Sequence, residues 1–121
     1  MGKRAEQAVN NHRSWISCSG SVLCAFADEA GLTQDEAKRM AAPFAGGRMG
    51  KCGAVMAAER VLEEKFGGEQ AQEMIQRLEA AFIAKNRSVD CRALRGLGLR
   101  PCRGCVKDTA EILEEMLTET D

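Results

Sequence analysis

The sequence predicts an all-α fold: a small bundle of about five helices forming a single domain over residues 1–121. Three observations support this prediction. Apolar residues recur at helical spacing along most of the chain, alternating runs of β-branched residues are nearly absent, and the helical stretches end at glycine or proline. With 121 residues, 45% of them hydrophobic, the chain is long enough to bury one core without disulfide crosslinks.

The first predicted helix runs from about residue 3 to residue 30, and Ser19-Gly20-Ser21 marks a place where it could break. Thr33-Gln34-Asp35-Glu36 has the spacing of a capping box, which starts a second, short helix reaching about residue 42. Pro43 and the glycines of segment 43–51 do not support a regular helix, so a loop is predicted there.

Helical periodicity resumes at Cys52 or Gly53 and stops at Gly67-Gly68. A further helix is predicted from residue 69 to about residue 85. Segment 86–101 is interrupted by two glycines and a proline, with room for one helical turn at residues 90–94. The last helix is predicted to start near Cys102 and to continue towards the end of the chain.

Charge and hydropathy exclude several classes of function. A formal net charge of -1 gives no global positive field, so nucleic acid is not an expected partner. No segment approaches the roughly 20 apolar residues of a membrane-spanning helix, and the first residues do not resemble a signal peptide. We therefore expect a cytoplasmic protein without membrane insertion. In that reducing compartment, clustered cysteines more often bind metal or cycle between redox states than form permanent disulfides.

Three of the six cysteines lie at predicted helix starts. Cys52 follows a glycine-rich loop that carries Arg48 and Lys51, and Cys102 precedes Arg103. Free backbone N–H groups and nearby cations at a helix N-terminus favour a thiolate, the form that exchanges disulfides and binds metal. Cys91, directly after Asp90, is predicted to occupy a similar position in a shorter turn.

Cys102-Arg103-Gly104-Cys105 is a Cys-x-x-Cys motif at a helix start, which brings two sulfurs close enough to form a disulfide or to share a metal. A four-thiolate metal site would need a second pair from Cys18, Cys52 or Cys91. Attachment of a c-type haem is excluded because Val106, and not histidine, follows the second cysteine.

Cys18 and Cys24 are six residues apart, which places them about 240° apart around one helix. Only one of them can therefore face a shared site. Cys18 lies beside Ser17, Ser19 and Gly20, whose small side chains permit close approach of another segment. Cys24, between apolar neighbours, is predicted to be a core residue.

Several of these motifs together resemble a known family. They are Cys18 in the first helical region, Phe44-x-Gly46-Gly47 leading into Cys52-Gly53-Ala54, Cys91-Arg92-x-Leu94, and Cys102 four residues before Val106-Lys107-Asp108. In these features the chain is similar to the bacterial and archaeal C_GCAxxG_C_C family of redox-active proteins, over nearly its whole length. The resemblance implies four family cysteines, at Cys18, Cys52, Cys91 and Cys102. It also implies a CGAxxG motif, from which the chain departs at Ala57. Cys24 and Cys105 are additional, and alignment of Cys105 in place of Cys102 stays open.

The leading functional hypothesis is a redox-active protein that uses thiol-disulfide exchange or electron transfer with a partner protein and requires no cofactor. Its predicted reactive residues are Cys18, Cys52, Cys91, Cys102 and Cys105. One alternative is a metal-binding module in which Cys18, Cys52, Cys91 and Cys102 hold zinc or an iron-sulfur cluster. Another is a non-catalytic interaction protein with buried cysteines. A homodimer is compatible with the amphipathic helices, and the sequence assigns no enzyme class.

Overall fold

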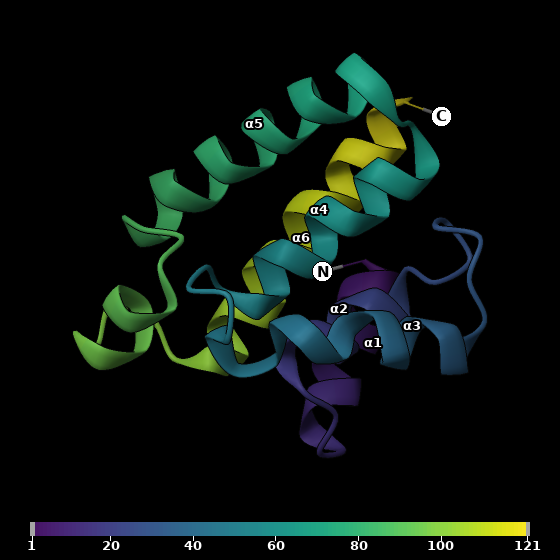
Figure 1. The fold of residues 1–121 in the computed structure, drawn as a ribbon. Coiled ribbons are helices and arrows are strands. Elements are labelled where there is room, and N and C mark those ends of the chain that lie inside the picture. The colour runs from purple at the N-terminus through teal and green to yellow at the C-terminus, as the bar shows by residue number, and fades with distance from the viewer. Residues whose placement is uncertain (1, 121) are drawn as a thin grey trace.

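Helices make up the regular structure of the computed structural model, which describes residues 2–120 (Figure 1). The prediction of an all-α fold is confirmed, although the helices are more numerous than the predicted five. Six α-helices and two short helical segments follow one another along the chain: α1 (Lys3–Arg13), α2 (Cys18–Ala25), α3 (Gln34–Ala41), η1 (Ala42–Gly47), α4 (Gly53–Lys65), α5 (Gly68–Asn86), η2 (Arg92–Gly96) and α6 (Cys102–Thr120).

The predicted first helix is divided into α1 and α2, which corrects the expectation of one helix over residues 3–30. The break lies at residues 14–17 and not at Ser19-Gly20-Ser21, which belong to α2. Trp15 adopts a φ of 70°, in the left-handed region that ends a helix, and its side chain is 97% exposed. The side chain of Ser17 then accepts a hydrogen bond from the N–H of Gly20 and caps α2.

Helix α2 is the centre of the fold, because all eight of its residues are buried. It packs against α1, α3, α4 and α6. A helix that is buried around its whole circumference requires neighbours on every side, and α2 has them. The N-terminus of α2, where Cys18 lies, is therefore placed inside the molecule.

The connection from α3 to α4 turns the chain back towards α2. The predicted capping box is confirmed, with Thr33 and Glu36 each satisfying the other's backbone N–H. Segment η1 contains non-helical residues, and Gly46 and Gly47 have φ values of 63° and 75°. These two glycines allow the tight turn that delivers Cys52 to the start of α4, so the predicted interruption of helix over segment 43–51 is observed.

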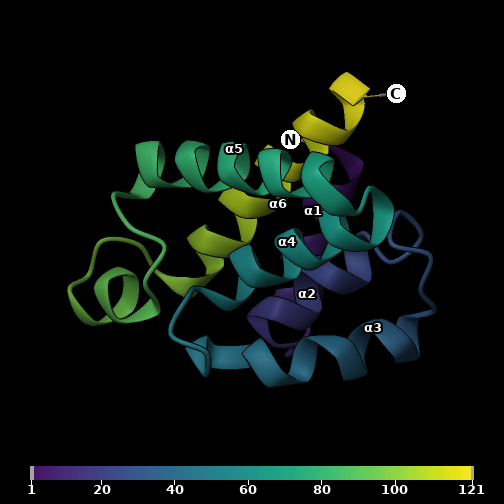
Figure 2. The same cartoon turned by 45° about the horizontal axis from the view of Figure 1, so that its top comes forward.

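Helices α4 and α6 lie side by side, and α5 crosses over them (Figures 1 and 2). Segment 87–101, between α5 and α6, projects from one side of this helical body in both views. It begins at Arg87, whose φ of 73° terminates α5. Within residues 2–120 no helix combines the length and the apolar character that crossing a bilayer would require.

Candidate functional site

Five of the six cysteines line one small cavity, together with Gly53, Leu94 and Arg95. The cysteines are Cys18, Cys52, Cys91, Cys102 and Cys105, the same five that the sequence predicts to be reactive. The cavity measures about 10 Å³, near the smallest space that holds one water molecule. All six cysteines are free thiols. The structure therefore gathers five reduced sulfurs in one nearly closed space.

Each sulfur comes from the start of a helix or helical turn. Cys18 is the first residue of α2, Cys52 is the N-cap of α4, Cys91 directly precedes η2, and Cys102 and Cys105 lie in the first turn of α6. Two backbone hydrogen bonds join the loops that carry Cys52 and Cys91. The N–H of Cys52 donates to Val89 O at 2.7 Å, and the N–H of Cys91 donates to Gly50 O at 3.0 Å.

Glycines at two positions allow these segments to approach. A Cβ atom at Gly53 would lie 2.6 Å from Phe44 O and 2.8 Å from Cys18 Sγ, both closer than van der Waals contact. A Cβ atom at Gly47 would overlap the side chain of Cys91. The bare glycine backbone at the start of α4 is therefore what lets Cys18 reach the cavity.

Cys18 and Cys102 form the first of two sulfur pairs. A hydrogen bond from the Cys102 thiol lowers the pKa of Cys18 to about 6, against the opposing effect of burial. The backbone N–H groups of Gly46 and Ser19 lower it further. The same hydrogen bond, together with burial, raises the pKa of Cys102. Cys18 is therefore the thiolate of this pair and Cys102 is its proton donor.

Cys52 and Cys105 form the second pair in the same way. The hydrogen bond from Cys105 lowers the pKa of Cys52, burial opposes this, and the N–H groups of Val55 and Ala54 at the start of α4 add to the lowering. The pKa of Cys105 is raised by the same hydrogen bond and by burial. The helix start of α6 was expected to favour a thiolate at Cys102, but the pKa of Cys102 is raised, because Cys102, like Cys105, donates its proton to a sulfur at another helix start.

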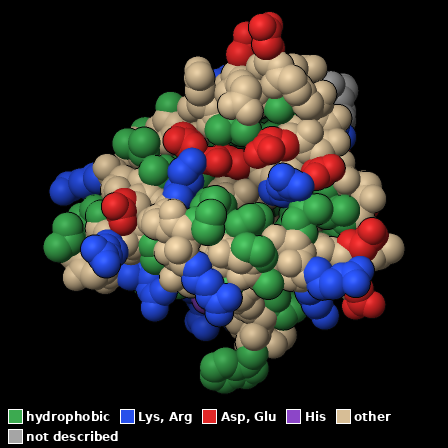
Figure 3. Space-filling model, viewed as in Figure 1, with side chains coloured by type: hydrophobic (Ala, Val, Ile, Leu, Met, Phe, Trp, Pro, Cys, Tyr) green, Lys and Arg blue, Asp and Glu red, His purple; other side chains and the backbone are tan. Residues whose placement is uncertain are grey.

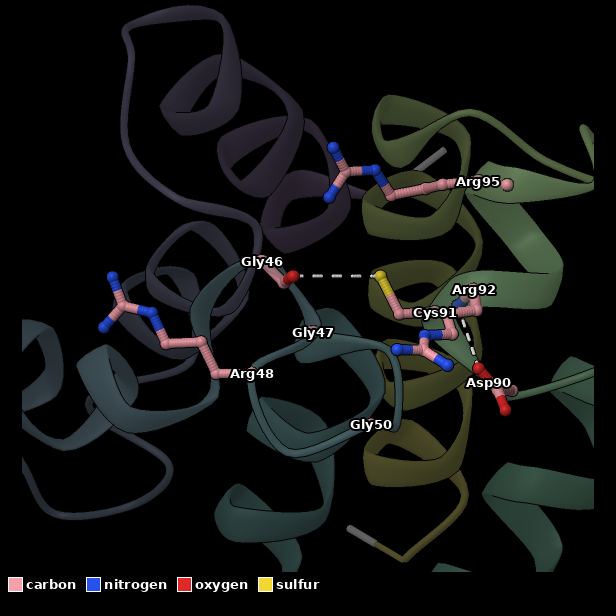
Figure 4. Close-up of a pocket in the computed structure, with 9 residues that line it drawn as sticks. Gly46, Gly47, Arg48, Gly50, Asp90, Cys91, Arg92 and Arg95 are labelled. Atoms are coloured by element: carbon pink, nitrogen blue, oxygen red, sulfur yellow. Dashed lines mark hydrogen bonds between the residues drawn. The ribbon is translucent and has the colours of Figure 1, made fainter.

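Cys91 is the fifth sulfur and lies at the outer side of the cluster. Its thiol donates a weak hydrogen bond to Gly46 O over 3.9 Å (Figure 4). Since the N–H of Gly46 interacts with Cys18, the backbone of this one residue links Cys18 to Cys91 through two successive peptide groups. Arg95 lies beside Cys91, and hydrogen bonding to that sulfur raises the pKa of the guanidinium. Cys91 is partly exposed, whereas Cys18, Cys52 and Cys105 are at most 6% exposed.

The start of α6 is held in place by an ion pair. Arg100, which precedes the helix, has Nε 3.2 Å from Asp108 Oδ2 and donates from Nη2 to Oδ1 at 3.3 Å. Asn86, at the end of α5, donates to Asp108 Oδ2 at 3.1 Å. Gly104 lies between the two cysteines of the Cys-x-x-Cys motif, and the side chain of Arg100 packs closely against its Cα. This network fixes where α6 begins and so where Cys102 and Cys105 lie.

Lys51 has a different role from the one predicted. The sequence suggests that it stabilises a thiolate at Cys52, but its Nζ contacts two glutamates from α4 and α5. It lies 3.1 Å from both oxygens of Glu59 and 2.7 Å from Glu79 Oε2. The positive charge of Lys51 is therefore neutralised beside the cluster and not directed at it.

Cys24 lies apart from the cavity, as expected from its position around the helix. Its sulfur faces the backbone oxygen of Gln34, 4.0 Å away at the start of α3, and burial raises its pKa. Among residues 2–120, no three cysteine, histidine, aspartate or glutamate side chains already have the spacing of a metal site. The five sulfurs of the cavity are thus close together without forming a ready coordination shell.

Two residues of the site have roles that the sequence motifs do not assign. Gly46 belongs to the glycine turn and to the family motif, but its N–H also interacts with Cys18 and its oxygen accepts a hydrogen bond from Cys91. Arg95 belongs to none of the motifs, although it lies one turn after Cys91 on the same face of a short helical segment. A cation four residues from a candidate cysteine is a signal that could have identified it.

Comparison with protein families supports the resemblance seen in the sequence. Residues 16–116 match the model of the family described as "Putative redox-active protein (C_GCAxxG_C_C)". That name writes its second motif as Gly-Cys-Ala-x-x-Gly. With Cys52 as its cysteine, the chain carries Lys51, Gly53 and Met56 at the other fixed positions, so the departure exceeds the one expected at Ala57. No curated protein and no solved structure matches the chain.

Proposed function

We propose, from the premise that the chain belongs to the C_GCAxxG_C_C family, that the five-cysteine cluster is the centre of a thiol-disulfide exchange protein. One observation carries the proposal. Two sulfur pairs, Cys18 with Cys102 and Cys52 with Cys105, each hold a lowered-pKa sulfur against a thiol that donates to it. A thiolate in contact with a second thiol is the arrangement from which a reversible disulfide forms.

The exchange begins at Cys91, because it is partly exposed and is the one cysteine of the cluster that also lines the open hollow formed by Gly46, Gly47, Gly50 and segment 90–96. The deprotonated Cys91 sulfur attacks a disulfide of a partner protein, which forms a mixed disulfide and releases one partner thiolate. The Cys18 thiolate then attacks the Cys91 sulfur, forming a disulfide within the cluster and releasing the second partner thiolate.

The atoms and electrons balance across these two steps. Two electrons leave the cluster as its sulfur-sulfur bond forms, and the partner disulfide becomes a dithiol by taking up two protons. Cys102 can next displace Cys91 from Cys18, which moves the disulfide into the hydrogen-bonded pair and returns Cys91 to its thiol form. The reverse sequence delivers the electrons back to the cluster.

The test is a free-thiol titration of anaerobically purified protein before and after reductant, with mass-spectrometric assignment of the disulfides. We expect at least two thiols to appear on reduction and the oxidised form to contain Cys18–Cys102 or Cys52–Cys105. Cys102→Ser should abolish the first of these disulfides, while Cys24→Ser, the matched control outside the cavity, should leave both unchanged. Six free thiols under every condition would leave only a role as an interaction protein with buried cysteines.

A second candidate function is metal binding by Cys18, Cys52, Cys91 and Cys102, favoured by the gathering of sulfurs around one space. Four thiolates are a suitable donor set for zinc or an iron-sulfur cluster. To coordinate an ion, the sulfurs would have to move from their present positions into the geometry of a metal site. Metal and sulfide analysis of the anaerobic sample distinguishes this candidate, since near-stoichiometric metal would favour it over exchange. The homodimer and the cytoplasmic location expected from the sequence stay predictions.

A further inference from the structure

An open hollow of about 760 Å³ adjoins the cysteine cavity on its outer side (Figure 4). Gly46, Gly47 and Gly50 form one wall, and segment 90–96 forms the other. Cys91 and Arg95 line both the hollow and the cavity. Cys91 is therefore the sulfur through which a molecule seated in the hollow would meet the cluster.

The hollow is strongly basic. Arg48, Arg92 and Arg95 line it against a single carboxylate, Asp90, although the Arg48 guanidinium turns away from Cys91 in Figure 4 and donates to Ala42 O at 3.4 Å. That carboxylate already accepts a hydrogen bond from the backbone N–H of Arg92 at 2.8 Å. Lysine and arginine side chains also gather at the lower left of Figure 3, where Figure 1 places this part of the chain. The local charge contrasts with the formal net charge of -1 for the whole molecule.

The size of the hollow favours a small molecule over a protein surface. Pockets for small ligands measure roughly 300–1,000 Å³, and this hollow falls inside that range. The glycine wall presents backbone without side chains, so a ligand can lie close to it. Guanidinium groups bind carboxylates through paired hydrogen bonds. A small ligand suited to the hollow therefore carries carboxylates.

We propose that the hollow binds a small, anionic disulfide and presents its sulfur-sulfur bond to Cys91. Arg92 pairs with its carboxylates, and Arg95 lies beside the reacting sulfur. Two electrons pass from the cluster to the ligand, which leaves as two thiols after taking up two protons, while a cluster disulfide forms. This inference rests on the exchange function proposed above and names one class of its substrates.

The experiment compares three disulfides as oxidants of the fully reduced protein: glutathione disulfide, which is dianionic, 2-hydroxyethyl disulfide, which is uncharged, and cystamine, which is dicationic. Each rate is divided by the rate of the same disulfide with a free small dithiol, so that intrinsic reactivity cancels. We expect the normalised rate to be highest for glutathione disulfide and to fall with added salt, because salt screens exposed charges.

A charge-reversal variant tests whether the preference depends on the hollow. Arg92→Glu should reduce the preference for glutathione disulfide over 2-hydroxyethyl disulfide by about fivefold, the upper value for one exposed ion pair. Arg39→Glu is the matched control, because Arg39 is exposed on α3 and does not line the hollow. It changes the net charge equally and should leave the preference unchanged. An equal loss in both variants would overturn the site.

Binding without exchange is measured separately. S-methylglutathione has the same carboxylates but no reactive sulfur, and we expect it to slow alkylation of Cys91 in the wild type and not in Arg92→Glu. Protection without any disulfide formation would support the anion site and contradict the exchange function. Exchange at equal normalised rates with all three disulfides, without protection, would contradict the anion site and leave the exchange function standing. If the reduced protein reacted with a protein disulfide but with none of the three small disulfides, the small-molecule site would also be overturned.

Discussion

Cys102 donates a hydrogen bond to the sulfur of Cys18, joining the first turn of α6 to the first residue of α2. The two residues are distant in sequence, and each begins a helix. Their contact gives the buried cluster its acidic sulfur, because the donated proton is what holds the pKa of Cys18 at about 6. The helix starts matter here mainly because they bring the sulfurs together.

The first prediction follows from this hydrogen bond. Cys102→Ala removes the donor, so the pKa of Cys18 should rise above 6, whereas Cys102→Ser retains an O–H donor and should keep it lowered. The measurement is the pH dependence of Cys18 alkylation, followed by mass spectrometry. The same midpoint in the alanine and serine variants would show that Cys102 does not control Cys18.

The same pair should make the stability of the reduced protein depend on pH. The folded pKa of Cys18, about 6, lies below the usual value of 9.0, so the unfolded chain binds more protons between these values. The contribution of Cys18 to the free energy of unfolding should therefore increase as the pH rises from 6 to 9. Above pH 9 the raised pKa of Cys102 makes its own contribution fall. Chemical denaturation at several pH values checks this, and the slope should be smaller in Cys102→Ala.

A second prediction concerns Gly53. Gly53→Ala places a Cβ atom 2.6 Å from Phe44 O and 2.8 Å from Cys18 Sγ, so we expect a loss of about 2 kcal/mol in the free energy of unfolding. Gly96→Ala is the control, because nothing lies within 4 Å of a Cβ atom there and its change should stay within about 0.5 kcal/mol. Denaturant unfolding measures both. Equal losses would show that close packing at the start of α4 is not the cause.

A third prediction concerns Asp108, whose side chain is only 10% exposed. Asp108→Ala leaves Arg100 and Asn86 without their partner, so the free energy of unfolding should fall by about 2 kcal/mol. Glu119→Ala removes a carboxylate of the same helix from the exposed pair with Arg77, and it should cost no more than about 0.5 kcal/mol. Because the ion pair of Asp108 holds the start of α6, faster alkylation of Cys105 should accompany the first variant only.

The fourth prediction uses the carboxylate cluster around Lys51. Burial and a hydrogen bond with Glu79 raise the pKa of Glu59 to about 8, and Lys51 limits the rise. The folded protein then holds a proton that the unfolded chain loses near 4.5, so the contribution of Glu59 to the free energy of unfolding should fall as the pH rises from 4.5 to 8. In Glu59→Gln this fall should be smaller by about 1 kcal/mol. Glu63→Gln, on the half-exposed side of α4, is the control and should keep the wild-type slope.

Much of the fold could be predicted from local signals. The capping box at Thr33, the glycine-rich turn before Cys52 and the glycines after residue 66 each mark a helix boundary that the structure contains. The break at Trp15 could not be predicted in the same way, because no glycine or proline marks it. Ser17, a residue typical of N-caps, is a signal for the start of α2. Apolar residues at helical spacing on both sides of the break nevertheless favour one continuous helix.

The sequence predicts that the loop before Cys52, the Cys91 turn and the start of the last helix converge near the first helical region and gather several thiols, and the structure contains this arrangement. Helix starts and family resemblance identified the five cysteines, and the angular separation of Cys18 and Cys24 identified the one that stays outside. Which sulfur donates to which depends on tertiary packing that sequence spacing does not encode, so the acidity of Cys102 was predicted with the wrong sign. The arginine-lined hollow likewise exists only because segment 90–96 folds opposite the glycine turn.

The number of sulfurs around the cavity is odd, and this sets a limit on its redox states. Disulfides consume cysteines in twos, so a cluster of five can close two bonds and store at most four electrons while one thiol stays unmatched. With the hydrogen-bonded pairs closed, the unmatched thiol is Cys91, which is partly exposed. With both pairs closed, the cluster would thus keep one thiol at the surface that has no partner within it. That thiol could form a disulfide with a second chain or with a small thiol.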